Sequence, residues 1–355
     1  MYRILNKIFL INACMSVMKD RRLIAFSTAL SAIFTIGILY STIQLPVMVN
    51  ELLRETFVDY GLNWSDAEKF IDSIRPLGYL SLTIIIALII LGFVLRKRKF
   101  SFLGSLTLYL PTFSYFASTM FFLAGIGILR ILWLPVIELS PGATWPEKIY
   151  FAREIFELGD IVYLPYDIVR LAVGYIGYIS NSFTFAEVFD IMFFFTMVLL
   201  SAAIFFLSCT IWLYSKFTKQ NIITSGIYKY SRHPQYLSFI LWTYALLLYD
   251  KYIFMPPKGG YFAPPPLLWL TVVTIIIAVA LYEENDMIKF YGADYIKYMN
   301  KTPFLIPLPR KFSSIILYPV RKIFKKDKPQ KGAEIFSILA IYYFIIVCLS
   351  LVYNL

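Results

Sequence analysis

The chain has 355 residues, of which 59% are apolar and 15% are charged, and its mean hydropathy is +0.69. A soluble globular domain carries about 45–50% apolar and about 25% charged residues. A chain of this length cannot bury such a surplus in a soluble core. The composition therefore excludes an ordinary soluble enzyme, a secreted disulfide scaffold and an intrinsically disordered chain. It predicts an all-α, polytopic integral membrane protein.

The net charge of +11 does not indicate a nucleic-acid partner. The charges lie in blocks between long uncharged runs, which is how a membrane protein fixes its orientation. The three cysteines, Cys14, Cys209 and Cys348, are isolated and have neither metal-ligand nor redox spacing. We predict that they are packing residues and that the chain holds no metal.

Seven uncharged runs have lengths near the 20 or so residues that a spanning helix needs, and they predict seven crossings. They are Leu23–Val49, Pro76–Leu95, Phe100–Leu129, Ile191–Ser215, Pro234–Tyr249, Leu267–Tyr282 and Ile335–Tyr353. The first run is too long for a signal peptide and lacks a small-residue cleavage site, so it is predicted to remain as an anchor. Ile161–Ser180 is an eighth candidate, but Asp167 and Arg170 interrupt it. We expect an interfacial or re-entrant helix there, with an eighth crossing as the alternative.

The distribution of basic residues predicts the orientation. With the N-terminus in the cytosol, the inner segments 1–22, 96–99, 216–233 and 283–331 hold 24 of the 33 lysines and arginines. The outer segments collect acids instead, six within 51–72 and six within 138–167. An excess of Lys and Arg marks the cytosolic side, so we predict a cytosolic N-terminus and motif segments, and a C-terminus outside. In a prokaryote the membrane would be the cell membrane.

The segment Arg310–Lys331 is a basic tail on the predicted cytosolic side. Anionic lipid attracts such a cluster by about 1 kcal/mol per basic residue. We expect contact with anionic lipid, and a docking site for a protein partner is the alternative.

Two of the runs, Pro234–Tyr249 and Leu267–Tyr282, have only 16 residues. Such a helix rises about 24 Å, which is less than the hydrocarbon thickness. We therefore expect their inner ends to continue into polar segments at the cytosolic surface, at 224–236 and 283–300. An antiparallel pair of helices would bring these two segments together.

The first polar segment has the features of an anion site. Pro234 suits the first turn of a helix because its missing N–H would be unpaired anyway, and Ser231 is a candidate N-cap. The backbone N–H groups and the positive dipole end of that turn, with Arg232 beside them, favour a carboxylate or a phosphate. Gly226 permits a sharp turn or a close approach to a ligand.

The second polar segment predicts an amphipathic helix that lies on the membrane and covers the pocket. Ile288, Tyr291, Tyr295 and Tyr298 repeat at helical spacing and form one face. Four charged residues lie off that face: Asp286, Lys289, Asp294 and Lys297.

These segments resemble a known family of membrane methyltransferases, which includes isoprenylcysteine carboxyl methyltransferases and phospholipid N-methyltransferases. The motifs that carry the resemblance are Gly226-x-Tyr228, Arg232-His233-Pro234-x-Tyr236, Glu283-Glu284, Tyr291-Gly292-x-x-Tyr295-x-x-Tyr298 and Pro303–Pro307. The resemblance covers about residues 220–310. It departs from the family at Ser238, where many members have glycine.

The resemblance implies a cytosolic pocket for S-adenosylmethionine. Arg232, His233 and Tyr236, with Pro234 between them, would contact the cofactor. Gly226 and Tyr228 would shape its approach, and Glu283 and Glu284 would meet its cationic amino or sulfonium end. The resemblance assigns no catalytic residue. Structural alternatives are a histidine that only holds the helix start and glutamates that are solvated at a helix end.

The sequence thus predicts three regions. Residues 1–185 form a transmembrane region of unknown role, 186–310 the methyltransferase-like core, and 311–355 the basic tail with the final helix. The expected activity is methyl transfer from S-adenosylmethionine to a lipid or lipid-attached acceptor, either an isoprenylcysteine-like carboxylate or a phospholipid amine. The alternatives are a reductase resembling the NADPH-dependent sterol reductases, which share the arginine-histidine-proline-tyrosine pattern, and a non-catalytic membrane subunit.

Overall fold

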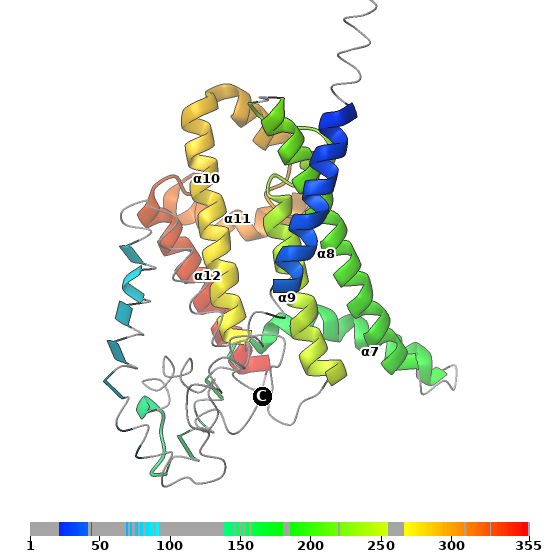
Figure 1. Ribbon diagram of the computed structural model, residues 1–355. Helices are drawn as coiled ribbons and strands as arrows, with labels where there is room; N and C mark the ends of the chain where they lie inside the picture. Colours follow the sequence, from blue (N-terminus) through cyan, green and yellow to red (C-terminus); the bar gives the residue numbers. More distant parts are fainter. Residues whose placement is uncertain are drawn as a thin grey trace, which may run out of the picture. The chain divides into compact units, whose positions relative to one another are not determined.

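The computed structural model describes residues 21–41, 158–179, 185–218, 221–254, 266–308, 310–326 and 328–353, together with isolated positions between 44 and 155. Within these residues the chain is helical and contains no strand. After the helix Arg21–Ser41 the elements are η2 (Asp160–Tyr163), α7 (Leu164–Ile179), α8 (Phe185–Phe217), η3 (Gly226–Lys229), α9 (Pro234–Leu248), η4 (Tyr249–Phe254), α10 (Pro266–Lys301), α11 (Arg310–Phe324) and α12 (Gly332–Tyr353), most of which are labelled in Figure 1.

Four helices in the described part of the chain are long and apolar enough to cross a membrane: Arg21–Ser41, Val188–Phe217, Pro266–Lys301 and Gly332–Tyr353. They confirm long apolar helices at four of the seven predicted runs. The run Pro234–Tyr249 forms α9, which has 15 residues and continues into the π-helical turn η4. The run Phe100–Leu129 lies outside the described residues, and only isolated positions of Pro76–Leu95 are described. The eighth candidate forms the 16-residue helix α7, and its interfacial position stays a prediction.

The chain divides into two compact units. The first consists of Met1–Ser41, Val198–Trp242 and Met287–Pro309, and the second of Thr42–Met197, Thr243–Asp286 and Arg310–Leu355. The helices α8, α9 and α10 each contribute one part to each unit.

In the first unit, α8 and α9 pack through small polar side chains. The Ser238 hydroxyl donates to the Ser201 carbonyl at 2.7 Å, and both side chains are fully buried. The Gln235 amide donates to the Cys209 sulfur at 3.6 Å. A glycine at position 238 would allow the helices to approach closely, and the serine replaces that approach with a hydrogen bond. Cys209 and Cys348 are free thiols, and Cys14 lies outside the described residues.

In the second unit, α10 and α12 run antiparallel. Thr271 is hydrogen-bonded to the Tyr343 hydroxyl at 2.9 Å, and further along α10 the Tyr282 hydroxyl packs against Gly332. At the far end of α12 the Ser350 hydroxyl accepts a hydrogen bond from the Ile161 N–H at 3.3 Å. The start of α12 therefore lies beside the glutamate-bearing part of α10, whereas its end lies beside η2.

Two acidic side chains in this part of the second unit, Asp190 and Asp167, have hydrogen-bond partners on other helices. Arg170 on α7 donates to both carboxylate oxygens of Asp190 on α8, at 2.9 and 3.0 Å, and the Tyr166 hydroxyl donates to the same carboxylate. Asp167 accepts hydrogen bonds from the hydroxyls of Tyr252 and Tyr353. The cost of placing these charges in an apolar protein is offset by direct pairing, as is expected for charges near membrane depth.

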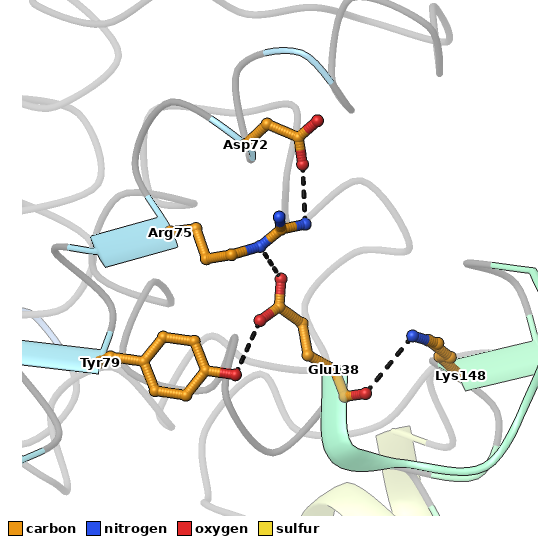
Figure 2. A network of polar contacts seen from close by, with 5 residues as sticks. All are labelled: Asp72, Arg75, Tyr79, Glu138 and Lys148. Atoms are coloured by element: carbon orange, nitrogen blue, oxygen red, sulfur yellow. Dashed lines mark hydrogen bonds and ion pairs between the residues drawn. The ribbon is translucent and has the colours of Figure 1, made fainter.

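A second polar network joins residues around the predicted outer end of the run Pro76–Leu95 to residues of the predicted outer segment 135–185 (Figure 2). Arg75 pairs with Asp72 at 2.7 Å and also donates to Glu138, which accepts a further bond from the Tyr79 hydroxyl at 2.9 Å. The Lys148 ammonium donates to the Glu138 carbonyl at 3.3 Å. Asp72, Arg75 and Tyr79 therefore lie beside Glu138 and Lys148 in the second unit.

We predict that Asp190→Ala strongly destabilises the protein. The substitution leaves Arg170 and Tyr166 without the carboxylate that both contact, and Asp190 is only 4% exposed. Because the Arg170 side chain is 39% exposed, the cost should lie between the roughly 1 kcal/mol of an exposed pair and the about 3 kcal/mol of a fully buried one. Thermal unfolding in detergent should show a clear loss of stability.

The matched control is Asp72→Ala, which removes an acid from an exposed ion pair with Arg75 and should cost about 0.5 kcal/mol. Equal losses for the two variants would show that the Asp190 cluster does not stabilise the fold.

Candidate functional site

The turn before α9 depends on Gly226. Its φ of 56° lies in the left-handed region, which glycine adopts without steric cost. A Cβ at this position would lie 2.4 Å from the Cδ1 atom of Ile211 on α8. The sharp turn that Gly226 permits is therefore observed, and this position also packs closely against a side chain of α8. Its close approach to a ligand stays a prediction.

The helix α9 begins at Pro234, as the sequence predicts. The Leu237 N–H donates to the His233 carbonyl at 3.0 Å, so His233 holds the N-cap position. The prediction of Ser231 as the N-cap is wrong by two residues. Its hydroxyl accepts a hydrogen bond from the His233 N–H at 3.3 Å. Proline fixes the start of the helix because it has no N–H to donate and its φ is already helical.

Arg232 joins the start of α9 to the end of α10 within the first unit. Its guanidinium donates to the Met299 carbonyl at 2.9 Å, and its backbone N–H donates to the Pro303 carbonyl at 3.0 Å. The guanidinium also lies 5.7 Å from the centre of the Phe304 ring. A cation near the last carbonyls of a helix complements the negative end of its dipole. Arg232 therefore has a structural role in addition to any role in binding a ligand.

His233 is only 9% exposed and lies between two aromatic rings. It stacks on Tyr236, with 5.6 Å between ring centres, and meets Phe304 edge-on at 5.1 Å. Phe304 is not among the predicted site residues, although it lies inside the Pro303–Pro307 part of the motif. Phe304 contacts Arg232 and His233, which are about 70 residues away in sequence, so no local pattern reveals this packing.

Tyr228 is a buried structural element of the same site. Its backbone carbonyl accepts a hydrogen bond from the Tyr298 hydroxyl at 2.7 Å, and its own hydroxyl donates to the Ser208 carbonyl at 3.4 Å. Burial, followed by the neighbouring Cys209 and Tyr298, raises the pKa of the Tyr228 hydroxyl well above its ordinary value. Tyr228 is therefore a neutral hydrogen-bond donor at physiological pH and is not suited to act as a base.

The helix α10 differs from the predicted short span. It does not end after Tyr282 but continues past the glutamate pair to Lys301, with a break in its backbone at Gly292, where φ is 53° and ψ is −125°. Tyr295 and Tyr298 beyond this break are buried, whereas Asp294 and Lys297 are exposed. The predicted two-sided character of this segment is therefore confirmed for these four residues.

The glutamate pair lies on α10 within the second unit. Glu284 is 1% exposed and Glu283 is half-buried. The Lys328 ammonium, from the segment between α11 and α12, lies 3.8 Å from the Glu284 Oε2 atom. A buried carboxylate with a cation beside it is not a solvated acid at a helix end.

Six predicted site residues lie in the first unit: Gly226, Tyr228, Arg232, His233, Pro234 and Tyr236. Three of them, Tyr228, Arg232 and His233, contact residues 298–304. Glu283 and Glu284 belong to the second unit. That Glu283 and Glu284 bind the same ligand as the Arg232-His233-Pro234 motif stays a prediction from the sequence.

Residues 183–254 match the model of the isoprenylcysteine carboxyl methyltransferase family. The match contains α8, the turn at Gly226 and the Arg232-His233-Pro234 motif, and it ends before the glutamate pair. No curated protein and no solved structure matches the chain. Over residues 183–254, and with the motif at the start of α9, this chain is similar to the isoprenylcysteine carboxyl methyltransferases.

Proposed function

We propose that this protein transfers a methyl group from S-adenosylmethionine to a lipid or lipid-attached acceptor at the cytosolic face of its membrane. The observation that carries the proposal is the family match over residues 183–254, which includes the Arg232-His233-Pro234 motif. The match supports a membrane methyltransferase. The cofactor, the acceptor and the membrane face are our inferences.

The start of α9 supports a site for the carboxylate of the cofactor. It presents the first-turn N–H groups of a 15-residue helix, with Arg232 two residues before its first residue. Helix starts bind anions through these N–H groups and the positive end of the dipole. A guanidinium has five N–H donors, so contact with the Met299 carbonyl does not exclude contact with an anion. The rings of His233, Tyr236 and Phe304 provide aromatic surface beside it.

Glu284 supports a site for the cationic end of the cofactor. S-adenosylmethionine carries an ammonium and a sulfonium, and a buried carboxylate binds a cation strongly because little water competes. The order of the motifs in the sequence is our ground for assigning Glu284 and Arg232 to one ligand. Glu283, next to it, is proposed for the same role.

Methyl transfer depends mainly on the alignment of the methyl group with the acceptor atom. Bound S-adenosylmethionine supplies an electrophilic methyl group for an in-line displacement at carbon, and much of the rate of such a step comes from orientation. A carboxylate acceptor needs no general base, whereas an amine must arrive unprotonated. The proposal therefore requires no catalytic acid or base among the residues of the site.

Several contacts support the proposed topology. Residues 160–167 and 251–252, which are predicted to lie outside, contact each other and residues 350–353 at the predicted outer end of the last span. Residues 328–331, which are predicted to be cytosolic, contact Glu284 and Asn285 just beyond the predicted inner end of the span Leu267–Tyr282. The proposed acceptors are lipids or lipidated molecules, because they would reach a protein with several membrane-spanning helices from the bilayer.

The topology is tested by cysteine labelling in a background from which Cys14, Cys209 and Cys348 have been removed. Lys258→Cys, in the predicted outer loop, should react with a membrane-impermeant maleimide only from outside. Lys289→Cys should react only from the cytosolic side, since 24 of the 33 basic residues lie on that side. Labelling of both residues from the same side would overturn the proposed orientation.

The cofactor is tested by binding measurements on the purified protein in detergent, with S-adenosylmethionine and NADPH compared directly. The parent should bind S-adenosylmethionine and not NADPH. His233→Ala and Glu284→Ala should each weaken binding tenfold or more, since loss of one partner of a desolvated contact costs about 2–5 kcal/mol.

Lys326→Ala is the control because the Lys326 ammonium pairs with Glu334 at 2.9 Å and not with Glu284. It should leave the affinity unchanged. Parent-like affinity in both site variants would remove the main support for this pocket, and preferential binding of NADPH would favour a reductase instead.

A further inference from the structure

The segment between α11 and α12 lies against the glutamate-bearing part of α10. We define this strap as residues 328–332, which lead from the end of α11 into the first residue of α12 (Figure 1). The Asn285 side-chain amide donates to the Gln330 carbonyl at 3.0 Å. A Cβ on Gly332 would lie 2.4 Å from the Tyr282 hydroxyl oxygen, so only glycine fits there without displacement of that tyrosine. The strap is therefore built to lie next to residues 282–285.

The basic residues of this region have separate partners. Lys326 pairs with Glu334, which also accepts hydrogen bonds from the N–H groups of Gln330 and Lys331 at 2.7 and 3.2 Å. Glu334 thereby fixes the strap at the start of α12, where a carboxylate satisfies N–H groups that have no partner in the helix. Lys328, and not Lys326, is left to extend to Glu284.

The contact between Lys328 and Glu284 is an ion pair without a direct hydrogen bond. Their charged atoms are 3.8 Å apart, which is beyond the range of about 2.7–3.2 Å for a hydrogen bond from nitrogen. Because Glu284 is 1% exposed, a ligand reaches its carboxylate only if a covering group moves. Lys328, at 23% side-chain exposure, is the more accessible member of the pair. A cationic ligand that forms short hydrogen bonds to Glu284 can therefore take the place of the lysine.

We propose that Lys328 is a positioning residue that holds the Glu284 carboxylate in the ligand-free protein and competes there with the cationic end of the cofactor. The inference rests on the proposed function, since it assumes that Glu284 meets S-adenosylmethionine. The strap then regulates access to the cofactor site, and its lysine sets the affinity below the value that the carboxylate alone would give.

The test compares binding of S-adenosylmethionine to the full-length protein in detergent with and without this lysine. Lys328→Gln should bind the cofactor about fivefold more tightly than the parent, because the competing cation is gone, whereas Lys328→Arg should resemble the parent. Lys326→Gln removes the same charge two residues away and should leave the affinity unchanged. The neutral analogue methylthioadenosine, which lacks both cationic groups, should bind all of these variants equally.

A double variant keeps the test decisive if the single variant is unstable. In a Glu284→Gln background, the added Lys328→Gln change should have no further effect on the affinity, because the two side chains act through one contact. Unchanged or weaker binding by folded Lys328→Gln, with Glu284→Gln still weakening the parent, would overturn this inference and leave the cofactor site standing. If Glu284→Gln had no effect on the affinity, or if the parent bound no cofactor, both the role of Lys328 and the proposed cofactor site would be contradicted.

Discussion

Inside the hydrocarbon of a bilayer no water is present to pair a backbone N–H or C=O group, so a spanning segment must satisfy these groups within itself. This constraint separates the apolar helices of this chain from its chemistry. The Arg232-His233-Pro234 motif lies at the start of α9, Met299 to Phe304 follow the break in α10, and Lys328 precedes α12. Glu284 lies inside α10 but is accompanied by Lys328. The groups proposed for the site therefore lie where a helix begins, ends or breaks, or where a partner is supplied.

The contacts of Arg232 show how polar groups at two helix ends satisfy each other. Its guanidinium and backbone N–H donate to carbonyls at the end of α10 and just beyond it. These contacts satisfy orphan carbonyls and at the same time hold residues 232–236 against Phe304. A site made in this way depends on the pairing of two helix ends, so its stability and its binding properties are linked. The buried cluster at Asp190 also depends on contacts between two helices. Its arginine and tyrosine come from α7 and its carboxylate comes from α8.

Hydropathy and local spacing predict much of this structure. The long apolar helices, the start of α9 at Pro234 and the turn at Gly226 follow from single segments whose residues dictate their own backbone. The contacts of Phe304 and the pair between Glu284 and Lys328 join residues that are 44 or more positions apart, and no periodicity encodes them. The frequency of serine at N-caps favours Ser231, but the proline at 234 determines where the helix starts. The fall in hydropathy at the glutamates predicts a shorter apolar span than α10, which continues through them.

The central claim is methyl transfer to a lipidic acceptor, and one measurement addresses it directly. The purified protein is reconstituted in lipid vesicles that contain a prenylated cysteine and is supplied with S-adenosylmethionine labelled in its methyl group, after which the organic extract is counted. The account predicts label in the extract, on the prenylated cysteine or on a phospholipid amine, and none when the protein is omitted. Binding of S-adenosylmethionine without any label in the lipid fraction would contradict it.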